Sequence, residues 1–179
     1  KLDYDNDFNF IVPKSNLKDV LSLCKDGDIK ISCSKLHAVF ETDEFTVHTR
    51  LLEGKYINYE GMFVKRGNIA AINRNILLES LKRALINVED KNKALLRFAI
   101  ENKKMIINAE SSLSKYMEEL ELEKEIDEPL DIGFNGTYLM DCLKALDNEV
   151  VEFNFGTNVQ PLIIEEEDKL SMVLPIKLR

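Results

Sequence analysis

The chain has 179 residues, of which 45% are hydrophobic and 31% are charged, and its net charge of -8 is ordinary for an acidic globular protein. No apolar run approaches the roughly 20 residues that a membrane span needs, and no basic and then apolar leader opens the sequence. We therefore expect an intracellular protein with one large or two small domains and no membrane partner.

A pattern of one strand, one amphipathic helix and three further strands occurs three times along the chain. Apolar residues at three- and four-residue spacing predict each helix, and alternating apolar and polar residues predict the strands. The predicted helices cover residues 14–25, 74–86 and 135–146. The predicted strands cover residues 8–12, 29–33, 36–41 and 45–52, then 68–72, 94–100, 105–109 and 116–124, and finally 130–134, 149–155, 162–165 and 169–177. The repeat is β-α-β-β-β, and we expect an α+β fold.

Two of the predicted helices follow an asparagine. Asn73 precedes the second helix and Asn135 precedes the third. Asparagine is a favoured N-cap because its side chain accepts hydrogen bonds from the first free backbone N–H groups of a helix. We therefore predict that both residues act as helix caps.

A loop and a linker separate the first repeat from the other two. Residues 65–68 look like a linker, and we place a domain boundary between residues 66 and 67. Just before it, Tyr56, Tyr59 and Phe63 interleave with basic residues. Such a loop is either held in place by its rings, which we favour, or is a basic and aromatic surface for nucleic acid.

The basic residues are concentrated on the predicted helices. The first two helices each carry a net charge of +2 and the third carries -1, so the helices carry +3 and leave -11 on the rest of a chain whose total is -8. Lys14, Lys18 and Lys25 share one stripe of the first helix. Two interpretations stay open: solvated helix faces, or a weakly basic surface presented to nucleic-acid phosphates.

We find no catalytic or metal-binding pattern. The acidic runs at residues 118–125 and 165–168 could supply a carboxylate pair, but no histidine or glycine-rich phosphate loop accompanies them. We interpret the first run as a solvated strand face and the second as a turn. His37 and His48 lack a serine or cysteine partner that the sequence can identify. An enzyme is therefore the less favoured class, and no cofactor is expected.

The three cysteines are widely separated. Cys24, Cys33 and Cys142 show neither a CxxC motif nor a metal-ligand spacing with histidine. We expect buried free thiols, as in a cytosolic protein.

The last stretch, residues 172–178, is strongly apolar. Pro175 lacks the N–H that a strand ladder needs, so the segment after it should leave the sheet. Two interpretations stay open for this stretch: a core strand, or half of a groove for a partner peptide.

Four stretches resemble, in order and spacing, the C-terminal half of the bacterial DNA polymerase III beta subunit, the sliding clamp family. They are RLLEGKYINY at 50–59, NRNILLESLKRALI at 73–86, IGFNGTYLMDCLKAL at 132–146 and VLPIKL at 173–178. In that family two β-α-β-β-β repeats form a domain, three domains form a subunit, and two subunits close head to tail into a ring around duplex DNA. The resemblance implies a DNA-clamp fold with helices on one face of antiparallel sheets.

The resemblance also implies that the chain is a fragment. Residues 1–66 would be the second half of the middle domain, and residues 67–179 would be the complete C-terminal domain. The first domain and the first half of the middle domain would be missing, so the homodimeric ring is not expected from this chain alone.

The function implied is that of a non-catalytic processivity factor in the bacterial cytoplasm, associated with the nucleoid. Its partners would be duplex DNA, bound without sequence specificity, and DNA polymerase III, the clamp loader and other proteins that carry short apolar clamp-binding peptides. The residues implied to face DNA are Lys14, Lys18, Lys25, Arg74, Lys82, Arg83 and Lys144. The residues implied to form the peptide groove are Val64, Asn135, Tyr138, Val159, Pro161, Met172, Val173, Leu174, Pro175, Ile176, Lys177 and Leu178.

Two departures from the family pattern concern the groove. Val64 and Ile57 stand where the family usually has prolines, so the local backbone is expected to differ from the family's at these two positions. The alternative function is a peptide-binding module that forms no ring and acts through the C-terminal apolar segment alone.

Overall fold

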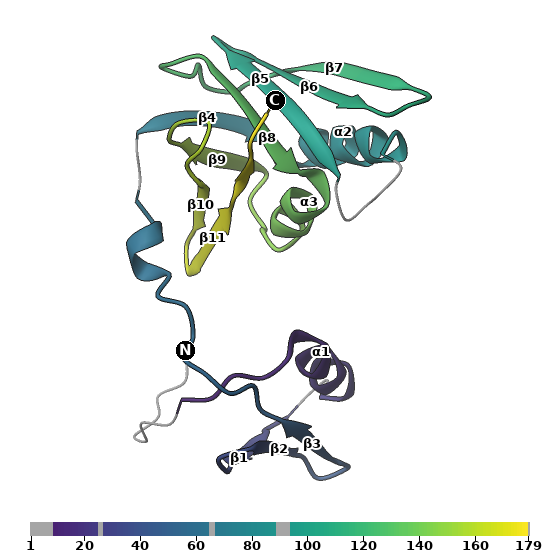
Figure 1. Cartoon of the computed structure of the whole chain (residues 1–179), viewed down its shortest axis with the longest axis vertical. Helices are drawn as coiled ribbons and strands as arrows, with labels where there is room; N and C mark the ends of the chain where they lie inside the picture. The colour runs from purple at the N-terminus through teal and green to yellow at the C-terminus, as the bar shows by residue number, and fades with distance from the viewer. Residues whose placement is uncertain (1–8, 25–26, 65–66, 89–93, 179) are drawn as a thin grey trace. The chain divides into compact units, whose positions relative to one another are not determined.

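The described residues form three α-helices and a set of antiparallel sheets, which confirms the predicted α+β fold (Figure 1). The computed structural model describes residues 9–24, 27–64, 67–88 and 94–178. The chain divides into two compact units, Lys1–Asn58 and Tyr59–Arg179. The predicted linker residues Lys65 and Arg66 lie outside the described residues. Among the residues that are described, no helix is long and apolar enough to cross a membrane.

The N-terminal unit contains one helix and one sheet. Helix α1 (Lys14–Leu23) is followed by strands β1 (Lys30–Cys33), β2 (His37–Glu41) and β3 (Thr46–Arg50), which pair antiparallel in that order. Val20 of α1 packs against Ala38, Phe40 and Leu51 in a small core. Val20 is the buried residue of α1 in this core, and the Asn16 side chain adds a hydrogen bond to Thr49 Oγ1 of β3 at 2.6 Å.

The C-terminal unit contains a four-stranded and a five-stranded sheet, two helices and a short 3-10 helix, η1 (Glu60–Met62). The helices are α2 (Arg74–Ile86) and α3 (Gly136–Lys144). The four-stranded sheet has the order β11 (Lys169–Val173), β10 (Leu162–Glu166), β9 (Val150–Phe155) and β4 (Asn68–Asn73). The five-stranded sheet has the order β12 (Pro175–Ile176), β8 (Leu130–Asn135), β5 (Leu95–Glu101), β6 (Lys104–Glu110) and β7 (Lys115–Glu121).

The opening strand of each repeat in this unit pairs with the other repeat. Strand β4 opens the second repeat and pairs with β9 of the third, while β8 opens the third repeat and pairs with β5 of the second. Helices α2 and α3 lie beside each other (Figure 1). Each of the two sheets of this unit therefore combines strands of the second and third repeats.

The predicted strand at residues 8–12 is wrong for the residues that the structure describes. Only Ile11 takes part in strand pairing, through a single bridge to Leu52. In the C-terminal unit an opening strand is supported by the sheet of the neighbouring repeat. The N-terminal unit holds one repeat, so this segment lacks the neighbour that would make it a strand.

The predicted strand at residues 169–177 is two strands in two sheets. Strand β11 ends at Val173 in the four-stranded sheet, and β12 begins at Pro175 on the edge of the five-stranded sheet. Pro175 pairs with Phe134 and Ile176 with Gly133. The chain does leave its first sheet at Pro175, as predicted, but it then joins a second one.

The core of the C-terminal unit fills the space between the sheets and helices. Its phenylalanines make edge-to-face contacts. The ring centroids of Phe98 on β5 and Phe134 on β8 lie 5.8 Å apart, and those of Phe153 and Phe155, both on β9, lie 5.7 Å apart. All four side chains are buried. This core holds β8, and with it the start of α3, in place.

Candidate functional site

A pocket of about 670 Å³ lies where the start of α3 meets the C-terminal strands. Helix α3 supplies one wall, and β11, β12 and the residue between them supply the other. The lining residues are Asn135, Tyr138, Cys142, Ser171, Met172, Val173, Leu174, Pro175 and Ile176. The pocket is open and largely apolar, with a few polar groups at its helical wall.

Asn135 sets the position of the helical wall. Its Oδ1 accepts hydrogen bonds from the backbone N–H groups of Thr137, at 3.0 Å, and Tyr138, at 3.4 Å. The predicted N-cap is therefore confirmed, as is the matching cap that Asn73 provides for α2. Because the cap fixes the first turn of α3, it also fixes where Tyr138 projects.

The exposed apolar residues of the pocket stand on both walls. Tyr138 is 65% exposed on the helix, and Leu174 is 62% exposed between β11 and β12. Val173, next to Leu174, is buried in the core. The chain turns here because it changes sheet at Pro175. As a result Val173 packs in the core, while Leu174 faces solvent. The arrangement suits an extended ligand with apolar side chains.

The structure brings together some of the predicted groove residues and not others. Asn135, Tyr138 and the segment from Met172 to Ile176 line one pocket. The residues that do not line it are Val64, Val159, Pro161, Lys177 and Leu178. Val64 and Val159 are exposed elsewhere on the C-terminal unit.

Two lining residues were missed by the sequence analysis, Cys142 and Ser171. Cys142 follows Tyr138 by one helical turn, so the helical spacing could have placed it in the same wall. Burial raises the pKa of the Cys142 thiol, which therefore stays protonated near neutral pH. Cys142 and Cys24 are partly buried and Cys33 is exposed, so the expectation that all three thiols are buried is wrong for Cys33.

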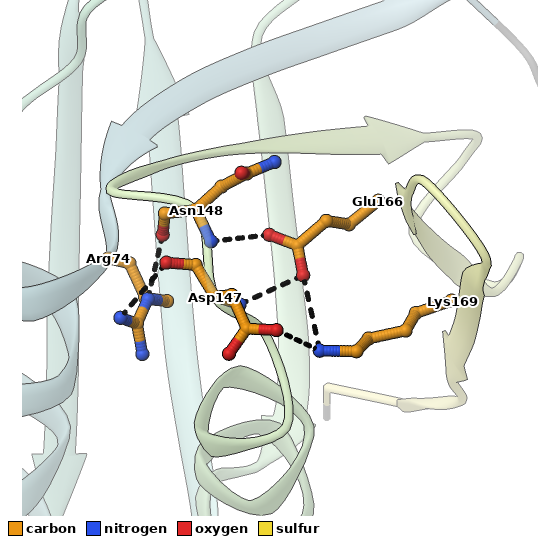
Figure 2. Close-up of polar contacts among 5 residues, drawn as sticks. All are labelled: Arg74, Asp147, Asn148, Glu166 and Lys169. Carbon is orange, nitrogen blue, oxygen red and sulfur yellow. Dashed lines mark hydrogen bonds and ion pairs between the residues drawn. The ribbon is translucent and has the colours of Figure 1, made fainter.

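A set of polar contacts ties the end of α3 to the hairpin of β10 and β11 (Figure 2). The Glu166 carboxylate accepts hydrogen bonds from the backbone N–H groups of Asp147, at 2.9 Å, and Asn148, at 2.5 Å. Lys169 forms ion pairs with Asp147 and with Glu166. We call Arg74, Asp147, Asn148, Glu166 and Lys169 the α3 latch. The latch therefore joins the loop after α3 to the hairpin that contains β11, and both of these elements contribute residues to the pocket or lead into it.

Arg74 closes the α3 latch from the side of α2. Its Nε donates to the carbonyl oxygen of Asn148 at 2.8 Å, and its Nη2 donates to that of Asp147 at 3.5 Å (Figure 2). The Arg74 backbone N–H also donates to Glu149 O at 2.7 Å. Arg74 was predicted to face DNA, but its guanidinium is occupied by these backbone carbonyls.

Glu166 was placed in a turn by the sequence analysis, and the structure corrects this. It is the last residue of β10 and is 7% exposed, and the turn consists of Glu167 and Asp168. A buried carboxylate is tolerated at this position because the backbone N–H groups of Asp147 and Asn148 donate hydrogen bonds to it and the Lys169 ammonium group pairs with it.

We predict that the α3 latch makes stability depend on acid pH. The Asp147 amide, followed by the Asn148 amide and Lys169, lowers the pKa of the Glu166 carboxyl. A carboxyl whose pKa is lower in the folded chain stabilises it above the unfolded value of about 4.3, and this contribution is lost as the pH falls through the folded value. Glu166→Gln should lower the thermal midpoint at pH 7 by several degrees, with the difference from wild type shrinking below pH 4.

The matched control for this prediction is Glu152→Gln, since Glu152 is an exposed glutamate on the neighbouring strand β9. Thermal unfolding followed by circular dichroism from pH 3 to pH 8 measures both variants. Equal losses for the two variants at every pH would contradict the role given to Glu166.

The basic residues predicted to face DNA differ in whether their side chains form ion pairs within the chain. Lys14 and Lys18 are exposed on α1, and Lys144 is exposed on α3. Lys82 pairs with Glu79 of its own helix at 2.6 Å. Arg83 pairs at 2.6 Å with Glu118 of β7. Lys25 lies outside the described residues.

Glu118 belongs to one of the acidic runs for which a catalytic role was the less favoured alternative. It accepts hydrogen bonds from Arg83 and from the Tyr116 hydroxyl, which is itself within 3.2 Å of Ser80 Oγ. These contacts join α2 to β7. Glu118 therefore has a structural role in the C-terminal unit.

Comparison with known protein families places most of the chain in one of them. Residues 64–176 match the family model described as the C-terminal domain of the DNA polymerase III beta subunit. The matched range contains every residue that lines the pocket beside α3.

Curated relatives match nearly the whole chain. The beta sliding clamp of Streptococcus pneumoniae is 26% identical over 181 residues, which are 96% of this chain and 48% of that protein. The beta sliding clamp of Rickettsia felis is 28% identical over 194 residues, which are 96% of this chain and 50% of that protein. The chain thus spans about half the length of these relatives.

Solved structures of the same kind superpose on it. A DNA polymerase III beta subunit from Pseudomonas aeruginosa has a TM-score of 0.83 at 26% identity, covering 94% of this chain and 48% of that one. A sliding clamp from the same organism, bound to griselimycin, has a TM-score of 0.81 at 26% identity, covering 94% of this chain and 47% of that one. The sliding clamp of Bacillus subtilis, at 20% identity, has a TM-score of 0.86 over all of this chain and 50% of its own, and shows the shared fold.

Proposed function

The chain belongs to the family of the DNA polymerase III beta subunit, and we propose that it is the C-terminal part of a DNA sliding clamp. The observation that carries the proposal is the family match over residues 64–176, which includes the pocket at α3. A sliding clamp is a non-catalytic processivity factor. It encircles duplex DNA and holds the polymerase at the template, so that tethering raises the effective concentration of the enzyme.

We propose that the pocket binds a short extended peptide from DNA polymerase III, the clamp loader or another partner. Tyr138 and Leu174 offer exposed apolar surface on opposite walls, which suits leucine and phenylalanine anchors of such a peptide. Val64, Val159 and Pro161 lie outside the pocket. They belong to a longer proposed footprint along which the rest of the peptide would extend.

We propose that residues 1–66 are half of a middle domain, and the free edge of β1 supports this. In the C-terminal unit, β5 and β9 each pair with the opening strand of the other repeat. Strand β1 is their counterpart in the first repeat, and among the described residues it pairs with β2 alone. An edge of this kind has unpaired backbone groups ready for another strand. The opening strand of the missing repeat would pair there.

The exposed face of α1 supports the same proposal. Its Leu17 and Leu21, one helical turn apart on the same face, are 39% and 71% exposed. In the C-terminal unit the two helices instead pack beside each other. The helix of the missing repeat would cover these leucines, because apolar side chains on a helix face are stabilised by burial against a partner.

We propose that ring closure uses the other outer edge of the five-stranded sheet. Strand β7 is the last strand of that sheet, and within the described ranges it pairs with β6 alone. Met117 on β7 is 75% exposed, and Leu113 just before it is 92% exposed. A second subunit of the full-length protein would pair along β7, so the homodimer is not expected from this chain alone.

We propose that DNA passes through the ring near the helices, in the bacterial cytoplasm at the nucleoid. Exposed lysines such as Lys14, Lys18 and Lys144 would contact phosphates weakly, which suffices when topology holds the DNA and permits sliding. The test is retention of the full-length subunit on closed circular DNA and its loss after the circle is cut. Equal loss from both forms would contradict the proposal and favour a peptide-binding module without a ring.

A further inference from the structure

Gly133 lies at the contact between β8 and the C-terminal strand. It pairs with Ile176 of β12 and stands between Ile132 and Phe134, which are both in the core. Since side chains alternate along a strand, position 133 faces away from that core. Gly133 is nevertheless buried, because Leu95 and the segment after β12 cover it.

A side chain at position 133 would meet three atoms. A Cβ built there would lie 2.7 Å from the Ile176 carbonyl oxygen, 2.8 Å from Leu178 Cδ2 and 2.9 Å from Leu95 Cδ1. The two leucine side chains can rotate away. The carbonyl oxygen is backbone, so it can give way only if the C-terminal strand itself moves.

The C-terminal strand is the part of this contact that is free to move. Strand β12 has two residues, and within the described residues it pairs with β8 alone, through two residue pairs. Strand β8 is held on its other side by six residue pairs with β5, from Leu95 to Ile100. Substitution of Gly133 would therefore displace β12 and leave β8 in place.

We propose that Gly133 is a positioning residue for the pocket. Its missing side chain lets β12 seat against β8, and β12 and Leu174 then form the C-terminal wall that faces α3. The ligand assumed for this pocket is the partner peptide, so this part of the inference rests on the proposed function. The seating of β12 is a property of the chain itself and can be measured without any peptide.

The same geometry gives Leu178 a different role from the one the sequence analysis implied. Leu178 does not line the pocket, but its side chain covers Gly133 on the outer side of β8. This contact of Leu178 with Gly133 keeps the segment after β12 packed against β8. A contact with the bound peptide is not needed to explain its place.

The experiment compares Gly133→Ala and Gly133→Val with wild type, and Gly61→Ala is the control because nothing lies within 4 Å of a Cβ at that position. Hydrogen exchange measured by NMR reports on the amides of residues 176–178 and, for reference, on those of β5. We expect exchange at 176–178 to rise by about tenfold or more in both Gly133 variants, since local opening exposes these amides, with β5 and the control unchanged. Binding of a labelled Gln-Leu-Ser-Leu-Phe peptide, chosen because it carries the leucine and phenylalanine anchors proposed for the partner, should weaken in parallel.

Leu178→Ala gives an independent reading if a Gly133 variant fails to fold. It removes a covering side chain and adds no atoms, so it should raise exchange at residues 176 and 177 in a folded chain. Unchanged exchange at the C-terminal strand in Gly133→Val, or in Leu178→Ala if Gly133→Val does not fold, would overturn the inference. A wild-type chain that binds no peptide while these variants loosen the strand would support the role of Gly133 and count against the proposed ligand.

Discussion

Joining the missing half of the middle domain to this chain is expected to strengthen its binding to a Gln-Leu-Ser-Leu-Phe peptide by about tenfold or more. The pocket at α3 offers two walls, and Tyr138 and Leu174 remain largely exposed on them. The resemblance to the clamp family implies that the preceding repeat would complete the middle domain and supply a further wall of the groove. Burial of one more large apolar side chain of the peptide contributes about 1.5–3 kcal/mol, which is the source of the expected gain.

Fluorescence anisotropy of the labelled peptide measures both forms of the chain. Tyr138→Ala should weaken binding in both by about tenfold or more, because truncation of a central tyrosine at an interface costs on the order of 2 kcal/mol. Leu113→Ala is the matched control, since Leu113 is exposed and does not line the pocket. No gain on restoring the half-domain, or equal effects of the Tyr138 and Leu113 variants, would contradict the groove.

Reversing the charge of the exposed lysines of α1 is expected to reduce both the DNA affinity and the DNA-polymerase stimulation of the full-length subunit. Lys14 and Lys18 are exposed on the helix. Each lysine that contacts a phosphate releases counterions on binding. Lys14→Glu combined with Lys18→Glu should therefore make the dependence of log K on log salt less steep by about 2.

The control for charge reversal lies on a sheet. Lys35→Glu combined with Lys104→Glu changes the total charge by the same amount. Both lysines are exposed, Lys35 between β1 and β2 and Lys104 on β6, where it pairs with Glu119. Affinity for a short duplex is measured from 50 to 300 mM salt, together with primer extension by the cognate polymerase. If the sheet variant loses as much as the helix variant, net charge alone explains the effect and the DNA-facing assignment fails.

Arg74 and Arg83 are poorer probes of DNA contact than the lysines. Arg74 holds the α3 latch and Arg83 pairs with Glu118, so replacing either would disturb packing as well as charge. A loss of DNA binding in these variants would carry two explanations. Lys144, exposed at the end of α3, has no such complication.

Local chemistry explains which parts of the fold were predictable. The caps at Asn73 and Asn135 depend on one side chain and the next three residues, so the sequence alone identifies them. The helix at Arg74–Ile86 was predicted to the residue because its apolar spacing continues without a break from cap to end.

Long-range pairing explains what was not predictable. Alternation shows that residues 169–177 are extended, but it cannot show that β11 and β12 belong to different sheets. Likewise, the apolar residues within 8–12 suggest a strand, yet a strand forms only where a neighbour is present. These outcomes depend on which repeat lies beside which.

The residues of the candidate site likewise fall into those that local sequence identifies and those that depend on long-range contacts. The apolar segment at 172–176 and the start of α3 were found from their residues and from the family resemblance, and the structure brings them together. Glu166 was missed because an acidic run usually marks a turn, and its true partners are backbone groups nearly 20 residues earlier in the chain. Gly133 was missed because the reason for a glycine there lies in the chain end that packs on it.

The most direct test of the clamp proposal is topological. The full-length subunit, loaded on nicked circular DNA by its cognate clamp loader, is followed by gel filtration before and after a restriction enzyme linearises the circle. We predict that it stays with the circular DNA for minutes at moderate salt and is lost from the linear DNA, because a ring leaves DNA only over an end. Equal dissociation from the two forms would contradict the proposal.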